Sequence, residues 1–220
     1  MIRHRLVIDT SRGTSVAVFA EGELVAEVNF EDTMKHAERI GGAIQQVLAE
    51  AKVSPSEIGS VVVGRGPAPF TGLRIGIAAA TAYSLGLGVP LFGVISLDAI
   101  ALAELERGSD ATASGEALLV TTDARRGEVY WGLYAGAGAE LKLLRGPAVG
   151  KLDSVLEELE AAGVGYRRST AAVSAAWLGR VFEAQLAAGT ESHDTSPLYL
   201  READAVAPKP GTQYGKAVSS

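Results

Sequence analysis

The hydrophobic pattern of the first half of the chain changes period in a fixed order, and this order limits the folds that the chain can adopt. Three stretches that alternate between apolar and polar residues come first, which predicts three β-strands joined in a meander. Helical and strand-like stretches then follow in turn. The predicted strands are 5–9, 15–20, 23–30, 61–64 and 91–95, and the predicted helices are 36–51, about 72–85 and 96–106. This order predicts an α/β fold.

A segment without charged residues, 75–97, lies in the middle of this half. A helix over residues 72–85 would be about 21 Å long, whereas the hydrocarbon core of a bilayer is about 30 Å thick. Gly86, Gly88 and Pro90 also interrupt the segment. We therefore expect a buried helix followed by a buried strand, and no membrane span.

The second half of the chain is less regular. Its predicted elements are a hairpin with strands 117–123 and 128–135, a further strand at 139–146, and helices within 151–163 and 171–189. A polar segment of small residues precedes them. The order of elements in the first half fits the ribonuclease-H-like half of an actin-like ATPase, with the second half as a reduced copy. We predict an N-terminal subdomain (1–107), a smaller C-terminal α/β subdomain (108–202) and a disordered tail (203–220).

The charge and composition of the chain exclude several function classes. The net charge is −6, which argues against a chain that grips nucleic acid by itself, because neutralising phosphates requires a basic face. The chain contains no cysteine, so disulfides, thiolate catalysis and cysteine-based metal sites are excluded. The first residues lack the pattern of a signal peptide. We expect a cytoplasmic protein.

The segment "GRGPAPFTGLRIG", residues 64–76, resembles a phosphate-binding loop at first sight. A Walker loop, however, ends in a lysine and a hydroxyl residue, and no lysine occurs between Lys52 and Lys142. The spacing G-x-G-x-x-G is also absent from this segment. The segment therefore predicts a turn that leads into a helix, with Thr71 as the N-cap residue.

Small residues form a stripe on each of the first two predicted helices. Gly41 and Gly42 lie in the middle of the first helix, at a cost of about 1 kcal/mol each relative to alanine, and the second helix carries Gly72, Gly76 and Ala80 at helical spacing. We predict that these small faces point outward and pack against a partner chain. The alternative is close packing inside the protein.

Arg74 is expected in the first turn of the second helix, where the helix dipole disfavours a cation. We expect it to meet a carboxylate of the partner or a phosphate. The alternative is a solvated arginine.

Few residues could perform chemistry. Asp9 ends the first strand beside Thr10 and Ser11, where actin-like ATPases hold phosphate and magnesium, although a turn would equally explain the motif. Arg65 and Arg74 complete the set that we place beside a nucleotide. His36 has neither a histidine nor a carboxylate three or four residues further on, so we expect a helix cap or surface residue and no metal site.

Several motifs together resemble the bacterial TsaB family, also called YeaZ. "GRGPAPFTGLRIG" is similar to the family signature G-R-G-P-G-S-F-T-G-L-R-I-G. "LVIDTS", "HAERI", "DARRGEVYW" and "SPLYLRE" occur in the family's order between residues 6 and 202. Ala68 and Pro69 replace the usual glycine and serine, which puts the details of any nucleotide contact at this loop in doubt.

The resemblance implies an actin-like fold and a non-catalytic subunit with no cofactor of its own. Such proteins bind TsaD through their first two helices and act with TsaE in forming threonylcarbamoyladenosine at position 37 of tRNA. The resemblance thus implies contact with tRNA only through the complex, and allows ATP or ADP at the partner interface. Two alternatives remain open, namely a weak ATPase that uses Asp9 and a glycoprotease-like homodimer of other function.

Overall fold

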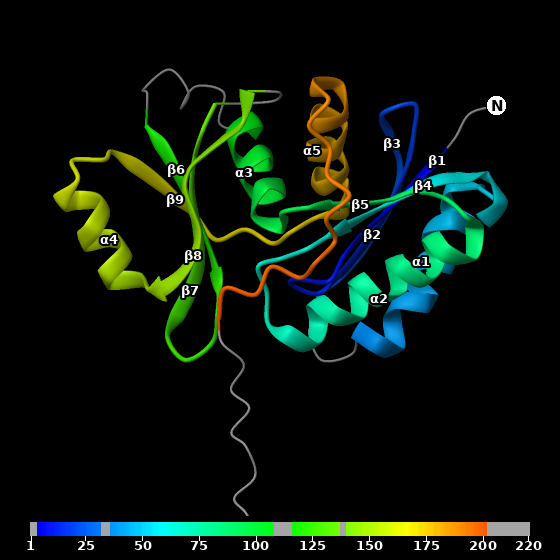
Figure 1. Ribbon diagram of the computed structural model, residues 1–220, viewed down its shortest axis with the longest axis horizontal. Coiled ribbons are helices and arrows are strands. Elements are labelled where there is room, and N and C mark those ends of the chain that lie inside the picture. The colour runs from blue at the N-terminus through cyan, green and yellow to red at the C-terminus, as the bar shows by residue number, and fades with distance from the viewer. Residues whose placement is uncertain (1–3, 32–35, 108–115, 137–139, 202–220) are drawn as a thin grey trace, which may run out of the picture.

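A computed structural model describes residues 4–31, 36–107, 116–136 and 140–201 of the chain. It contains two β-sheets that stand side by side with helices between and outside them (Figure 1). The predicted tail at 203–220 lies outside the described residues, as does most of the predicted boundary segment.

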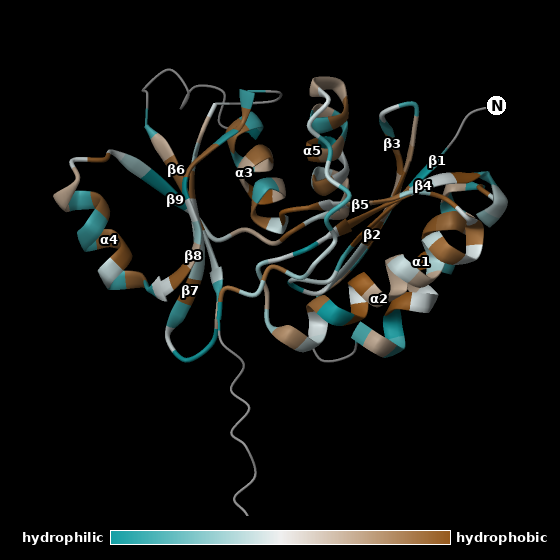
Figure 2. Cartoon of the chain, viewed as in Figure 1, coloured by the Kyte–Doolittle hydropathy of each residue, from teal (hydrophilic) through white to brown (hydrophobic). Residues whose placement is uncertain are grey.

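The first sheet has five strands in the order β3-β2-β1-β4-β5. β1 pairs antiparallel with β2 and parallel with β4, so the meander becomes a parallel sheet at β1. The strands are β1 (His4–Asp9), β2 (Thr14–Ala20), β3 (Glu23–Phe30), β4 (Ile58–Gly64) and β5 (Leu91–Val94). Because both faces of β1 and β4 are covered by helices, these strands are apolar runs rather than strict alternations (Figure 2).

The second sheet has the order β8-β7-β6-β9. Its strands are β6 (Ala117–Asp123), β7 (Glu128–Ala135), β8 (Lys142–Lys151) and β9 (Tyr166–Ser169). The sequence pattern predicted the hairpin of β6 and β7 and the strand β8 but not β9, which has only four residues and pairs parallel with β6.

Five α-helices among the described residues complete the layers. α1 (His36–Ala51) and α2 (Phe70–Leu87) cover one face of the first sheet. α3 (Ser96–Arg107) and α5 (Ala175–Ala188) lie between the two sheets, and α4 (Leu152–Ala161) covers the outer face of the second sheet (Figure 1). A 3-10 turn (Pro55–Glu57) precedes β4. None of the described helices is both long and apolar enough to span a bilayer.

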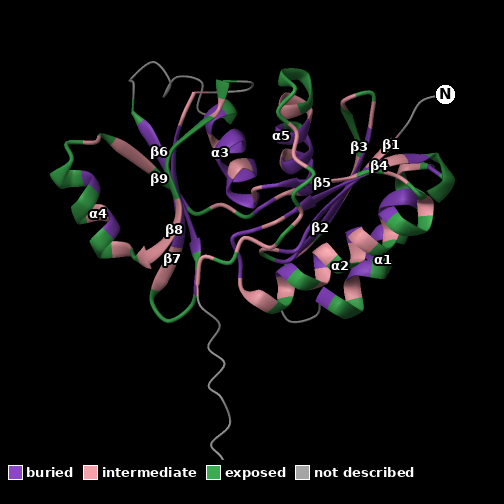
Figure 3. Ribbon diagram, viewed as in Figure 1, coloured by how far each residue is buried: buried purple, intermediate pink, exposed green. Residues whose placement is uncertain are grey.

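Side-chain alternation along the strands assigns the cores to these layers. Leu6 and Ile8 face α1 and α2, whereas Val7 between them faces the central helices. The central core joins the two sheets because it also contains Leu118 and Tyr134 of the second sheet. Most residues of β1, β2, β4 and β6 are buried (Figure 3).

The last helix returns to the first sheet. α5 lies in the predicted subdomain 108–202, yet Gly179 packs so closely on Phe19 of β2 that a side chain there would overlap the ring. The Glu27 carboxylate of β3 accepts a hydrogen bond of 2.8 Å from the Ala176 N–H at the start of α5. The chain thus crosses back over the predicted boundary.

The second helix begins earlier than the pattern predicted. Pro69 is its N-cap residue, with φ −57° and ψ 140°, so Thr71 lies within the first turn. The prediction that Thr71 caps the helix is wrong, because Pro69 already provides the extended backbone from which the helix starts.

Candidate functional site

A cleft of about 730 Å³ opens where the carboxyl end of β1 faces the β6–β7 hairpin. Thr10 and Ser11 line it from the first sheet, and Thr122, Asp123 and Arg125 line it from the second. Polar residues at the ends of adjacent elements are typical of binding sites in α/β folds. The cleft is therefore the main candidate for a small-molecule site.

Asp9 lies beneath this cleft and not in its wall. The side chain is 1% exposed, and its Oδ1 accepts hydrogen bonds from the Ser11 N–H (2.8 Å) and Ser11 Oγ (2.5 Å). Its Oδ2 accepts a hydrogen bond of 2.6 Å from Ser96 Oγ. Burial raises the pKa of Asp9 above its usual range, although the hydrogen bonds from Ser11 and Ser96 oppose the shift.

The surroundings of Asp9 favour a structural role. A side chain at Gly64 would overlap the Asp9 carboxylate, so strand β4 encloses it from the side. Among the described residues, no group of three or more histidine, aspartate or glutamate side chains could hold a metal ion. The turn interpretation of the motif at Asp9, Thr10 and Ser11 agrees with these contacts.

The small-residue stripe of α2 points inward. Ala80 is fully buried, and a side chain at Gly76 would overlap Thr10 Oγ1. A Cβ atom at Gly72 would lie 2.9 Å from the Thr10 carbonyl oxygen and 3.0 Å from His36 Nε2. The prediction that Gly72, Gly76 and Ala80 face a partner is therefore wrong, since they allow α2 to pack tightly on β1 and α1.

His36 is buried and not on the surface. It begins α1, is 6% exposed, and its Nδ1 lies 3.1 Å from Thr14 Oγ1 of β2. The prediction of a surface residue is wrong, because the start of α1 packs between β2 and the glycine face of α2. The prediction of a helix cap stays a prediction.

Arg74 contacts aromatic residues of its own chain. It lies in the second turn of α2, and its Nε donates a hydrogen bond of 2.7 Å to Tyr199 Oη. Its guanidinium lies 5.4 Å from the Phe70 ring centroid and 5.5 Å from that of Tyr199. Arg74 is exposed, so the alternative of a solvated arginine agrees with this position, and its contact with a partner carboxylate or a phosphate stays a prediction.

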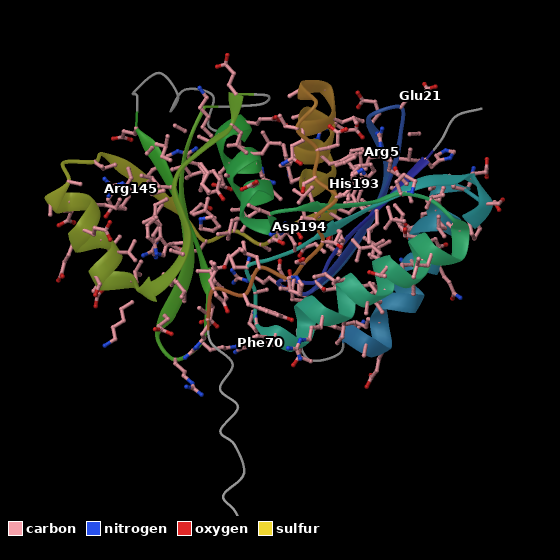
Figure 4. All side chains as sticks on the ribbon, viewed as in Figure 1. Arg5, Glu21, Phe70, Arg145, His193 and Asp194 are labelled. Carbon is pink, nitrogen blue, oxygen red and sulfur yellow. The ribbon has the colours of Figure 1, made fainter. Side chains whose placement is uncertain are left out.

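Arg65 is held by the segment 190–201 that follows α5, which we call the return segment. Its Nη1 forms an ion pair with the Asp194 carboxylate and donates a hydrogen bond of 3.0 Å to the Asp194 carbonyl. Figure 4 labels Asp194 on the return segment. Hydrogen bonds from Ser196, and then the contact with Arg65, lower the pKa of Asp194 to about 2. Arg65 and Arg74 do not line the cleft, so the predicted nucleotide set is not brought together as a whole.

The solvent-facing sides of α1 and α2 form a second candidate site. A side chain at Gly41 or Gly42 would meet no other atom within 4 Å, and Leu85 is 76% exposed. The two helices pack on each other and on the same sheet face, so their outer sides adjoin (Figures 1 and 3). We call this surface the helix-pair face, defined by Gly41, Gly42, Ala78, Ala82 and Leu85.

Comparison with known proteins identifies the family. The chain matches the family of TsaD, tRNA N6-adenosine threonylcarbamoyltransferase, over residues 24–187. It is 35% identical to the tRNA threonylcarbamoyladenosine biosynthesis protein TsaB of Escherichia coli over 130 residues, which cover 59% of this chain. YeaZ from Pseudomonas aeruginosa superposes on 90% of the chain with a TM-score of 0.71 and 25% identity. The chain belongs to the TsaB family.

Two uncharacterized mycobacterial proteins are also similar to this chain. An uncharacterized protein of Mycobacterium tuberculosis strain H37Rv is 38% identical over 180 residues, which cover 79% of each chain. One from Mycobacterium leprae is 41% identical over 150 residues, which are 66% of this chain but only 38% of the relative. The match spans 54% of the length of Escherichia coli TsaB. The likeness to YeaZ over 100% of that chain confirms the predicted actin-like, ribonuclease-H-like fold.

The cleft of about 730 Å³ also contains residues that the sequence interpretation did not identify. Ser96, which anchors Asp9, begins α3 just after β5, and Thr122 and Asp123 end β6. A usable signal was present, because polar residues that follow neighbouring strands meet at one edge of a sheet. Asp123 also begins the family motif at 123–131.

Proposed function

We propose that this chain is a non-catalytic subunit in the formation of threonylcarbamoyladenosine in tRNA, and that it docks on a TsaD-type transferase through the helix-pair face. The names of its relatives support the pathway. The observation that carries the docking surface is the exposure of Gly41, Gly42, Ala78 and Ala82 beside the exposed side chain of Leu85. Small residues on adjoining helices let a partner helix approach closely, and Leu85 supplies apolar area to bury.

A non-catalytic role agrees with the environment of Asp9. Both carboxylate oxygens accept hydrogen bonds from Ser11 or Ser96, so binding magnesium would require these bonds to be replaced. The net charge of −6 further supports contact with tRNA through the complex and not by this chain alone.

Reconstitution tests this function. The transferase, TsaE, the threonylcarbamoyl-adenylate synthase, tRNA, ATP, threonine and bicarbonate are combined with and without this chain, and modified adenosine is measured by mass spectrometry. We expect modification to require the chain and to survive Asp9→Asn. Equal modification without the chain would overturn the proposal.

The cleft supports a second candidate function, which is binding of ATP or ADP. Its volume of about 730 Å³ falls in the range of small-molecule sites, and Thr10, Ser11 and Thr122 are among its lining residues. Calorimetric titration of ADP into the isolated chain and into its complex with the transferase distinguishes a site of this chain from one completed by the partner. Absence of binding in both samples would contradict a nucleotide site here.

A further inference from the structure

A second, smaller cavity of about 180 Å³ lies between α3, α5 and β7. It shares no lining residue with the cleft. Its apolar wall includes Leu102, Leu143 and Val181, and its polar wall includes Asp98, Tyr134 and Gln185. The proposed function uses none of these residues.

Asp98 carries a charge without a counterion among the described residues. Its Oδ1 accepts a hydrogen bond of 2.8 Å from Tyr134 Oη, and no ion pair to Asp98 is formed within the part of the chain that the structure describes. Removal from water raises the pKa of Asp98 to about 6, and the hydrogen bond from Tyr134 opposes the shift. Asp98 is half-buried in the first turn of α3, and a carboxylate that has lost part of its hydration is stabilised by a paired cation.

The rest of the polar wall offers further hydrogen-bond acceptors. Gln185 Oε1 is buried and has no hydrogen-bond partner within the described residues. Tyr134 uses its proton on Asp98, which leaves its oxygen as an acceptor towards the cavity. The last turn of α5, with Gln185 and Ala188, adds the negative end of a helix dipole. A group with donors and positive charge therefore complements Asp98 and the acceptors of Tyr134 and Gln185.

We propose that this cavity binds a primary alkylammonium group, with the nitrogen at Asp98 and the alkyl chain along Leu102 and Val181. An ammonium has three donors and no acceptor, which matches the acceptor atoms of Asp98, Tyr134 and Gln185. The volume admits a short aliphatic chain and is too small for a nucleotide. The ligand is either a free alkyl amine or the lysine side chain of another protein. This inference does not depend on the proposed function.

Titration calorimetry on the full chain at pH 7.5 tests the site with n-butylamine, and with n-butanol as the neutral probe of similar shape. We expect saturable binding of n-butylamine only, with at least about tenfold weaker binding to Asp98→Asn. Asparagine at position 98 keeps an acceptor for Tyr134, so we expect the variant to fold. Circular dichroism checks this. Equal binding of both probes, or equal binding of n-butylamine to wild type and variant, would overturn the proposal, as would no binding at millimolar concentration.

A measurement on the wild type alone keeps the test decisive if the variant does not fold. Affinity for n-butylamine should fall as the pH drops below about 6, because Asp98 takes up a proton while the amine stays charged. An affinity that is constant from pH 5 to pH 8 would contradict the site. Comparing 1,4-diaminobutane with Nα-acetyl-lysine methylamide then distinguishes a free amine from a lysine side chain.

Discussion

Gly76 of α2 lies directly against Thr10 at the end of β1, with no space for a side chain between them. One turn earlier, the Gly72 carbonyl accepts a hydrogen bond of 2.8 Å from Thr10 Oγ1. The helix is thus fastened to the strand through a hydroxyl and two glycines. This contact positions both the wall of the cleft and the outer side of α2.

Replacing Gly76 with alanine should destabilise the fold. The added methyl group would overlap Thr10, and such overpacking typically costs about 1–3 kcal/mol. Gly42→Ala is the matched control, because a side chain there meets no atom within 4 Å and alanine favours the helix by up to about 1 kcal/mol. Urea unfolding of both variants checks this, and equal stabilities would contradict the close contact.

Replacing Ala82 with arginine should block docking on the transferase while leaving the fold intact. Ala82 is exposed on the helix-pair face, so the larger side chain costs little in the free protein but places an unpaired charge in the interface. We expect at least about tenfold weaker binding by calorimetry. Ala187→Arg, at an exposed position of α5, is the control. Unchanged binding of the Ala82 variant would exclude this part of the face from the interface.

Replacing Asp98 with asparagine should make the protein more stable at neutral pH. The pKa of Asp98 is about 6 in the fold and 3.8 in the unfolded reference, so the native state holds more protons between these values. Its contribution to the free energy of unfolding therefore falls as the pH rises from about 4 to about 6. Asparagine removes this loss, and we expect a gain of about 1–3 kcal/mol at pH 7.

The difference between wild type and Asp98→Asn should shrink as the pH falls through 3.8, because the carboxyl group is already protonated in the native state and then becomes protonated in the unfolded state as well. Denaturant unfolding across this range measures the difference, and Asp153→Asn at an exposed position serves as the control. A gain that does not change with pH would contradict a burial effect on Asp98.

Replacing Gly93 with alanine should release the return segment. A side chain there would overlap the Asp194 carbonyl, and the Gly93 N–H donates a hydrogen bond of 2.8 Å to the Ser192 carbonyl. We expect a loss of about 1–3 kcal/mol and faster amide exchange at Leu198, whose N–H donates to the Arg65 carbonyl at 2.8 Å. Gly86→Ala, which meets no atom within 4 Å, is the control. Protection of Leu198 as in the wild type would contradict this attachment.

The site was less predictable than the elements, because its residues come from separate parts of the chain. Asp9, Thr10 and Ser11 were recognised from a local motif, and Thr10 and Ser11 line the cleft. Ser96, which is 87 residues from Asp9, leaves no local sign of the hydrogen bond that they form. Arg65 similarly forms an ion pair with Asp194 of the return segment. The path of that segment depends on where α5 ends.

Hydrophobic period alone determined the helix His36–Ala51, the meander and the α/β order, because these depend on neighbours along the chain. The direction of a small-residue stripe was decided only by the tertiary structure. Gly42 and Gly76 are equally small, and a bare glycine suits both an outer surface and a tight internal contact. Gly42 faces solvent because it lies on the side of α1 that points away from the sheet. Gly76 faces Thr10 because it lies on the side of α2 that packs on the sheet. Both orientations arise from the packing of all the layers together.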